Sequence, residues 1–580
     1  MIKQLMKSIR EYKKATILTP CLVGLEVVLE VAVPYYMAKL IDDGIYKSSM
    51  DDTIKIGLIL VVCAILSLLF GALAGMASAK AGSGFAKNLR KDLYYKVQNF
   101  SFENIDKFST SSIVTRLTTD VTNVQNAFQM IIRGAVRAPF MLIFSLIMAI
   151  KINVKMSIIF FVLIPIVALI LFVISRLAMP IFQEVFKKYD DLNNIVEENT
   201  SGMRVVKSFC LEDEEEEKFR NKSNEIYKLF SKAETILAFN SPTMQLAMYS
   251  AMLLISWIGA RMIVLSNMTE LETGELSSLI TYAIQILFSI MMLTLISVLV
   301  TISVASAKRI CEVLEEEPTI KNKENPIKEV NSGEIEFKDV CFSYVGNKDK
   351  EVLKNINIKI KSGETVGIIG GTGVGKSSLV NLLPRLYDVT EGELLVAGNN
   401  VKDYDLETLR DSVSCVLQKN VLFSGTIKEN LRWGNENATD EELVEACKLA
   451  QADGFINEFP EKYDTYIEQG GTNVSGGQRQ RLCIARALVK KPKILILDDS
   501  TSAVDTKTDK LIRDAFASKI PDTTKIIIAQ RISSVEECDK IIVMEQGKID
   551  GVGTHEELIK NNKIYKEVYE SQVKGGSENE

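Results

Sequence analysis

The sequence predicts two unlike parts: an α-helical membrane domain of six spans that extend into the cytosol, followed by a soluble α/β domain. Three observations predict this fold class. Long apolar runs crowd the first 305 or so of the 580 residues. A charged break with two prolines follows at 315–331. Beyond the break, a glycine-rich loop stands between an apolar strand and an apolar helix. A chain of this length exceeds one compact core.

Six segments are apolar over the roughly 20 residues that a membrane span needs. The predicted spans are 16–38, 55–79, 127–150, 156–179, 241–265 and 277–303, within a membrane domain at 15–310. With the N-terminus inside, the inner segments hold 5, 7 and 10 basic residues and the outer ones 3, 2 and 0. The excess of Lys and Arg marks the cytosolic side. We therefore expect a multi-pass plasma-membrane protein with both termini and the soluble domain in the cytosol.

The segment before the first span predicts a short helix. In residues 1–14, apolar side chains recur at helical spacing with lysines between them. This pattern is typical of an amphipathic helix on the inner membrane surface.

The two inner connections are long, and their flanks have helical patterns, so we expect each to form a helical hairpin. The predicted tips lie near Glu103–Thr110 and Phe209–Phe219. The acidic run Glu214–Glu217 lies at the second tip. Such a run usually forms a solvated face; docking on the soluble domain is the alternative.

Charged residues inside spans are costly and suggest function. Glu26 and Glu30 lie one helical turn apart in the first span, and Arg133 and Arg137 do so in the third. Two interpretations remain open. The residues line a polar cavity for cationic substrates, or they form an internal ion-pair network.

Methionines concentrate in the last two spans. They are Met244, Met248, Met252, Met291 and Met292. Methionine suits promiscuous apolar binding surfaces because it is flexible and polarisable. Plain helix packing or lipid contact is the other interpretation.

Composition excludes several classes of protein. A net charge of −6 gives no sign of a nucleic-acid partner, and none of the nine cysteines forms a CxxC pair. Neither a metal site nor a disulfide framework is therefore indicated. The remaining predicted segments are a linker at 311–331, a nucleotide-binding domain at 332–570 and a flexible tail at 571–580.

The glycine-rich loop matches the phosphate-binding pattern G-x-x-x-x-G-K-[ST]. It comprises Gly370, Gly371, Thr372, Gly373, Val374, Gly375, Lys376 and Ser377, and Ser378 opens the helix that follows. Backbone N–H groups of such a loop wrap phosphates, and the helix N-terminus adds a favourable dipole. Lys376 is expected to pair with the β- and γ-phosphates of ATP, and Ser377 to bind Mg²⁺.

Two later segments suit the same chemistry. Asp498 ends the apolar strand 494–498, where a carboxylate can hold Mg²⁺. The run Val474–Gln478 places Ser475, Gly476 and Gly477 ahead of a helix, which makes a second anion site from backbone donors.

Together these motifs resemble the ATP-binding cassette of ABC transporters, and the resemblance covers nearly the whole chain. Six spans and one cassette are similar to an exporter half-transporter. The resemblance implies further roles. Tyr344 stacks on adenine, Gln418 contacts Mg²⁺ and the membrane domain, and Ser475 with Gly476, Gly477 and Gln478 forms the signature motif. Ser502–Asp505 resembles the loop that crosses to the partner cassette, and Ser377, Gln418 and Asp498 match the family's Mg²⁺ ligands.

Two positions depart from the family pattern. Asp499 stands where the family has its catalytic Glu, which places the carboxylate roughly 1–1.5 Å further from the attacking water. Gln530 stands where the switch histidine follows a strand. The chain's one histidine is His555, 25 residues further on. The two changes together predict a site that binds ATP and hydrolyses it slowly.

In this family two cassettes close head to tail, so the resemblance implies a heterodimer with unlike sites. The expected partner is a second half-transporter that carries the catalytic Glu and the switch His. The expected substrates are hydrophobic and drug-like. Three alternatives remain: a homodimer with weak ATPase activity, an ATP-gated regulator that does not pump, and an exporter of lipid or peptide.

Overall fold

A computed structural model of the chain describes residues 1–345, 350–499 and 504–577. The chain divides into two compact units. The first contains Met1–Gln98 and Ser109–Glu316, and the second contains Asn99–Phe108 and Glu317–Glu580.

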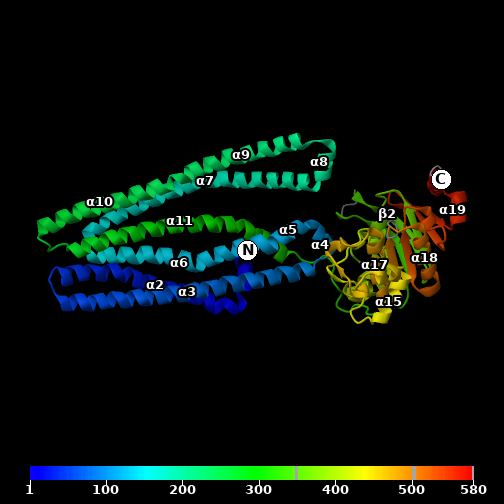
Figure 1. The fold of residues 1–580 in the computed structure, drawn as a ribbon, viewed down its shortest axis with the longest axis horizontal. Coiled ribbons are helices and arrows are strands. Elements are labelled where there is room, and N and C mark those ends of the chain that lie inside the picture. The colour runs from blue at the N-terminus through cyan, green and yellow to red at the C-terminus, as the bar shows by residue number, and fades with distance from the viewer. Residues whose placement is uncertain (346–349, 500–503, 578–580) are drawn as a thin grey trace. The chain divides into compact units, whose positions relative to one another are not determined.

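The first unit is built from long helices that run side by side. They are α2 (Lys13–Lys39), α3 (Met50–Gln98), α6 (Val121–Ile152), α7 (Val154–Ser201), α9 (Glu212–Ala238), α10 (Asn240–Ser266) and α11 (Thr273–Glu315). Helix α2 packs along α3, α6 along α11, and α7 along α9 and α10 (Figure 1). Among the described residues six helical segments are long and apolar enough to cross a membrane, and each contains one predicted span.

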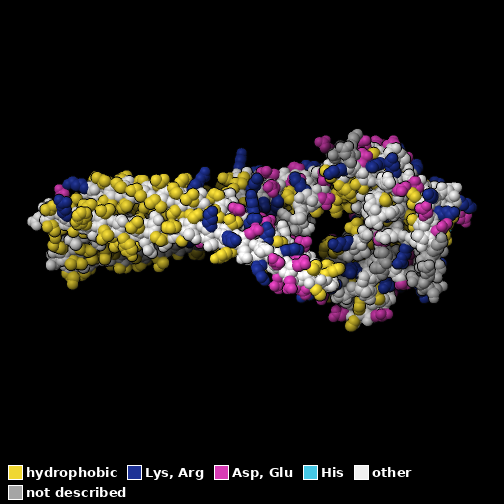
Figure 2. Space-filling model, turned by 90° about the horizontal axis from the view of Figure 1, so that it is seen from above, with side chains coloured by type: hydrophobic (Ala, Val, Ile, Leu, Met, Phe, Trp, Pro, Cys, Tyr) yellow, Lys and Arg dark blue, Asp and Glu magenta, His cyan; other side chains and the backbone are white. Residues whose placement is uncertain are grey.

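The surface of this unit separates apolar from charged side chains. Hydrophobic side chains cover the stretch of the helices that holds the spans, and Lys, Arg, Asp and Glu gather where the helices continue beyond it (Figure 2). The six-span fold and its cytosolic extensions are therefore confirmed.

Short helices close the two hairpins. The first tip holds α4 (Phe102–Lys107) and leads into α5 (Thr110–Thr115) and the π-turn Arg116–Asp120. The second tip is α8 (Met203–Phe209), which ends at Cys210 with a left-handed φ of 56°. The predicted second tip at 209–219 is wrong for most of its length because α9 begins at Glu212. Its acidic residues occupy the first turn of a helix, where negative charge is favourable.

The N-terminal segment is not one helix. It forms α1 (Ile2–Met6) and a 3₁₀ segment (Lys7–Tyr12) that turns at Arg10, where φ is 42°. Ser8 donates to Asp92 of α3 at 2.7 Å, and Arg10 pairs with the same carboxylate at 2.6 Å. These contacts bury Ser8 and Ile9 against α3, so the continuous amphipathic helix expected at 1–14 is corrected.

The second unit holds two main sheets. Its strands are β1 (Ile335–Phe342), β2 (Leu353–Ile360), β3 (Thr365–Gly370), β4 (Glu391–Val396), β5 (Asn399–Asn400), β6 (Val413–Val416), β9 (Ile494–Asp498), β10 (Thr524–Ile528), β11 (Lys540–Glu545) and β12 (Lys548–Gly553). One sheet has the order β2-β1-β4-β5, and the other β12-β11-β3-β10-β9-β6. The short pair β7 (Gly425–Thr426) and β8 (Tyr466–Ile467) stands apart.

Helices cover the sheets. They are α12 (Lys376–Asn381), α13 (Leu406–Ser412), α14 (Ile427–Arg432), α15 (Asp440–Leu449), α16 (Asp453–Glu458), α17 (Gly476–Val489), α18 (Thr506–Lys519), α19 (His555–Asn561) and α20 (Lys563–Ser577). One apolar core joins α17, α18 and α20 to β9, β10 and β11. A second lies between the two sheets, around β1, β2 and β3.

Two predicted boundaries change. Helix α11 continues to Glu315, so the first residues of the linker predicted at 311–331 are helical. Helix α20 runs to Ser577, so the tail predicted from residue 571 is helical over most of its length. The pairs Lys563–Glu567 and Lys566–Glu570, at i and i+4, favour the helix there.

Candidate functional site

Five strands of the six-stranded sheet, β11, β3, β10, β9 and β6, are parallel, so their carboxyl ends share one edge. In their register Asp498 of β9 lies opposite Ile528 of β10, and Ile528 lies opposite Ile368 of β3. Loops that leave the carboxyl ends of parallel strands meet in space. The phosphate loop after β3, Asp499 after β9 and Gln530 after β10 therefore share one edge, and Gln418 follows β6 at the same edge.

The phosphate loop adopts the backbone that its glycines permit. Gly373 and Gly375 have φ of 81° and 97°, a conformation that other residues rarely adopt. Gly375 is the N-cap of α12, and a Cβ there would come within 2.9 Å of Leu353. At Gly373 nothing lies within 4 Å of an added Cβ, so the loop is open there.

Lys376 is held at the mouth of the loop. Its ammonium donates to the carbonyl oxygens of Gly370 and Gly371, each at 2.7 Å. Burial lowers the pKa of Lys376, and the charges of Asp498 and Asp499 oppose that shift. A desolvated ammonium next to open backbone donors fits a phosphate chain.

Two of the three predicted magnesium ligands, Ser377 and Asp498, meet beside it. Asp498 is only 5% exposed. Burial raises the pKa of Asp498, and a hydrogen bond from the Ser377 hydroxyl opposes the shift. A hydroxyl and a buried carboxylate are the oxygen ligands that Mg²⁺ prefers, so these residues fit the ion.

The two residues that depart from the family pattern contact each other. The side-chain amide of Gln530 donates to Oδ2 of Asp499 at 2.9 Å. Asp499 has a left-handed φ of 48°, and its backbone N–H donates to Ile528 O at 2.9 Å. Gln480 of α17 donates to the backbone oxygen of Asp499 at 3.4 Å. Sequence reasoning missed Gln480 because nothing in the motif signals a contact made 19 residues away.

Tyr344 belongs to an aromatic cluster that reaches α4. Its hydroxyl lies 2.9 Å from Ser378 Oγ, and its ring contacts Tyr387 edge to face at 5.1 Å between centroids. Tyr387 in turn contacts Phe102, and its hydroxyl donates to Asp106 at 2.7 Å. Helix α4 therefore packs on the same cluster as the residue expected to hold adenine. Tyr387 carries no motif of its own, and sequence reasoning missed it.

Helix α4 is tied to the segment after α11 as well. Asn104 donates to the backbone oxygen of Glu317 at 3.1 Å, and the hydroxyls of Ser101 and Thr319 lie 2.6 Å apart. The first hairpin tip is thus part of the nucleotide-binding unit.

The signature segment is separate from the phosphate loop. Ser475 is the N-cap of α17; its Oγ accepts from Gln478 N at 3.3 Å, and Gln478 Oε1 accepts from Ser475 N at 2.9 Å. This capping box leaves Ser475 and Gly476 exposed. Among the described residues, no hydrogen bond links Ser475 to the phosphate loop.

The remaining predicted residues lie at helix ends or in loops. Asp505 caps α18 by accepting from Thr508 N at 3.0 Å, and this bond lowers the pKa of Asp505. Ser502 and Ala503, of the loop predicted to cross to a partner, lie outside the described residues. Gln418, Gly371 and Thr372 are exposed, and Val374 packs on the inter-sheet core. His555 lies elsewhere, 2.7 Å from the Tyr565 hydroxyl.

In the membrane domain, three of the four charged span residues form an ion-pair network. Arg137 of α6 bonds Glu26 and, at 2.7 Å, Glu30 of α2. Glu26 is only 7% exposed. Of the two interpretations, the internal network therefore describes Glu26, Glu30 and Arg137.

Breaking this network is expected to destabilise the membrane domain. The R137M variant leaves the buried Glu26 carboxylate without its cation, which costs about 3 kcal/mol or more. Unfolding titrations in SDS of the purified chain measure the loss. The K155M variant is the matched control, since it breaks the ion pair between Lys155 and Glu270, whose side chains are both exposed. Such a surface pair contributes less than about 1 kcal/mol to stability. Equal losses in the two variants would contradict the network's role.

An apolar cavity of about 580 Å³ lies between α7, α10 and α11. Four of the methionines singled out in the sequence line it, together with Phe288 and a few polar residues; these methionines are Met244, Met248, Met291 and Met292. Met252 is not among its lining residues.

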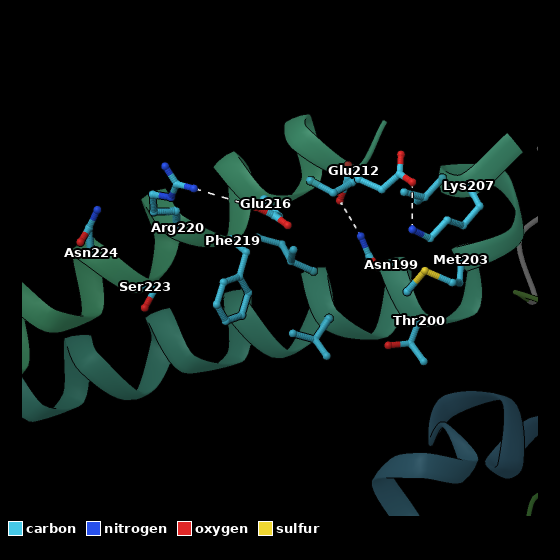
Figure 3. A pocket seen from close by; sticks show the side chains of 14 residues that line it. Asn199, Thr200, Met203, Lys207, Glu212, Glu216, Phe219, Arg220, Ser223 and Asn224 are labelled. Carbon is cyan, nitrogen blue, oxygen red and sulfur yellow. Dashed lines mark hydrogen bonds and ion pairs between the residues drawn. The ribbon is translucent and has the colours of Figure 1, made fainter. Parts of the chain in front are cut away.

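A second cavity, of about 690 Å³, lies at the second hairpin tip between α7, α8 and α9. Its acidic side chains have partners within the tip: Glu212 accepts from Lys207 at 2.9 Å, and Glu215 accepts from Asn199 at 3.3 Å (Figure 3). Arg220 lies 4.0 Å from Glu216. The acidic side chains of this cavity are therefore paired with residues of the same hairpin, as expected for a solvated face.

Comparisons with known proteins agree with this architecture. The ABC transporter transmembrane region family matches residues 17–291, and the ABC transporter family matches residues 353–502. The chain is 38% identical over 554 residues to the uncharacterized ABC transporter ATP-binding protein YfiB of Bacillus subtilis, covering 95% of this chain and 96% of that one. It is 32% identical to the ATP-dependent lipid A-core flippase of Desulfotalea psychrophila, with 85% of each covered.

The fold has a solved counterpart. The structure of a bacterial Atm1-family ABC exporter with ATP bound superposes with a TM-score of 0.81 at 23% identity, covering 97% of this chain and 98% of that one. The protein is accordingly a multi-pass plasma-membrane protein with a cytosolic ATP-binding domain. With these matches, the chain belongs to the ABC transporter family and has the architecture of an exporter half-transporter.

Proposed function

We propose that this chain is the degenerate-site subunit of a heterodimeric ATP-driven exporter. The contact between Asp499 and Gln530 carries the proposal. Both groups that would handle the attacking water are altered, and they are bonded to each other.

The geometry favours slow hydrolysis with retained binding. A general base must reach the proton of the attacking water, and Asp499 is one methylene too short. Its Oδ2 accepts from an amide that has no cationic form. Bound Mg²⁺ would neutralise phosphate charge, with Ser377, Gln418 and Asp498 as its ligands. The loop and Lys376 are regular, so ATP is expected to bind.

The signature segment supports a role in a second site. Its capping box holds the first turn of α17 with Ser475, Gly476 and Gly477 at the helix N-terminus, which suits an anion. Since no hydrogen bond links this segment to the phosphate loop in the described part of the chain, we infer that it completes the hydrolytic site of a partner chain with the catalytic Glu and the switch His.

Hydrophobic small molecules are the proposed substrates. The methionine-lined cavity supports this class, because its walls are apolar and adaptable. Lipid flipping is the second candidate, and the relatives named lipid A-core flippases favour it.

ATP turnover of purified protein tests the proposal. The chain alone is expected to hydrolyse ATP much more slowly than the chain co-purified with its partner half-transporter. Equal rates for the chain alone and the pair would overturn the split-site proposal and favour a homodimer. A pair that hydrolyses ATP but moves no substrate in vesicles would favour the ATP-gated regulator.

A further inference from the structure

A side chain of the C-terminal helix holds the loop that carries Gln530. Nε2 of Gln572, on α20, donates to the backbone oxygen of Gln530 at 2.8 Å. Oε1 of the same side chain accepts from the backbone N–H of Ile532 at 2.9 Å. One amide thus satisfies two backbone groups on either side of one residue, as an adjacent β-strand would.

Helix α20 is itself firmly placed. Tyr565, Val568, Tyr569 and Gln572 follow one another at helical spacing on one face. Tyr565 is fully buried, and Val568 and Tyr569 pack on the core that includes Ile532 and Val535. Gln572 therefore lies on the same face of α20 that packs on the core, next to the loop it bonds.

Gln530 is consequently held at both ends. Its backbone oxygen accepts from Gln572, and its side-chain amide donates to Asp499 at 2.9 Å. Gln572 is exposed and fills no core position, so its contribution lies in these two hydrogen bonds rather than in packing. Releasing them frees the loop where it meets the edge that carries the phosphate loop and Asp498.

We propose that Gln572 is a positioning residue of the nucleotide site: it fixes the loop after β10 so that the Gln530 amide stays at Asp499 and beside the terminal phosphate of bound ATP. The proposal rests on the proposed function only in that ATP binds at this edge of the sheet. It makes the C-terminal helix a determinant of how long the nucleotide is retained.

Three variants of the full-length chain separate this role from general stability. Q572L removes both hydrogen bonds at similar volume. Q572E keeps the acceptor for Ile532 N–H but places a carboxylate oxygen against the carbonyl of Gln530. S571A is the matched control on the same helix, because the Ser571 hydroxyl is exposed and donates to Val568 O of that helix at 3.0 Å.

The first readout is hydrogen exchange of residues 529–535. Q572L is expected to speed exchange in this loop about tenfold, as loss of two ordinary hydrogen bonds predicts. Q572E is expected to speed it as well, because it loses the bond to Gln530 O and sets a carboxylate oxygen against that carbonyl, while S571A leaves it unchanged. The second is release of a radiolabelled, non-hydrolysable ATP analogue with Mg²⁺, chased with unlabelled ATP. Release is expected to be about 5–10-fold faster in Q572L and Q572E and unchanged in S571A.

The outcomes are distinct. Unchanged exchange in Q572L would show that Gln572 does not hold the loop after β10 and would overturn the proposal. Faster exchange with unchanged nucleotide release would also overturn it, because Gln572 would then only stabilise the loop. Because the analogue is not hydrolysed, this result does not depend on whether the native site is slow. High ATPase activity of the chain alone would refute the degenerate site and leave the Gln572 result standing.

Discussion

Restoring the two altered residues, in the variant D499E/Q530H, is expected to raise ATP turnover of the chain purified alone by about 10²-fold. The longer side chain moves the carboxylate roughly 1–1.5 Å closer to the attacking water. The imidazole replaces an amide that has no cationic form. The measurement is steady-state phosphate release at saturating Mg–ATP.

The single changes serve as controls for this expectation. D499E alone keeps the Gln530 amide next to the carboxylate, and Q530H alone keeps the short side chain, so each is expected to recover only part of the gain. D499N/Q530H restores the imidazole without a base and is expected to stay near the native rate. Similar rates in D499E/Q530H and the native chain would mean that Asp499 already works as the base or that the site is limited elsewhere.

ATP binding is expected to change little in these variants, because the groups that hold the phosphates are unaltered. Lys376 and Ser377 lie on the phosphate loop, and Asp498 precedes the changed position. A rise in turnover with an unchanged dissociation constant for the analogue assigns the gain to chemistry rather than to binding.

Local signals predicted most of what lies along the chain. The spans follow from hydropathy alone, and the phosphate loop from glycines between a strand and a helix. The acidic run misled the placement of the second hairpin tip because the same residues suit a helix N-terminus. In the structure α8 ends at Cys210, which has a left-handed backbone, and α9 begins at Glu212, so the acidic run belongs to a helix rather than to the tip.

Contacts between distant residues could not be predicted. Arg137 meets Glu26 across 111 positions, and sequence alone left open whether such charges line a cavity or pair with each other. Gln572 contacts Gln530 across 42 positions, and a glutamine on the exposed part of a helix gives no sign of such a contact in the sequence. These pairings depend on how the helices pack. The hydrophobic pattern of a sequence indicates which face of a helix is buried, but not which single side chains meet across the packed faces.

Placing a negative charge in the signature segment is expected to slow ATP hydrolysis by the proposed heterodimer. S475D keeps an N-cap acceptor for α17, so the helix remains capped. Its carboxylate would face the phosphates of ATP bound to the partner chain, where fixed donors are needed. Loss of such stabilisation costs about 10²–10³-fold in turnover, and we expect ATPase activity of the pair to fall by about that much.

Two variants of this chain make the result specific. T439D places the same carboxylate at the N-cap of α15, which has the same capping box and is not part of the predicted nucleotide site, so it tests the effect of a charged cap alone and should leave turnover unchanged. K376A should weaken ATP binding to this chain. If S475D lowers turnover of the pair while the chain itself still binds the ATP analogue, its signature acts on the partner's nucleotide. If S475D instead weakens binding to this chain when purified alone, two copies of the chain share the site and the homodimer becomes the better description.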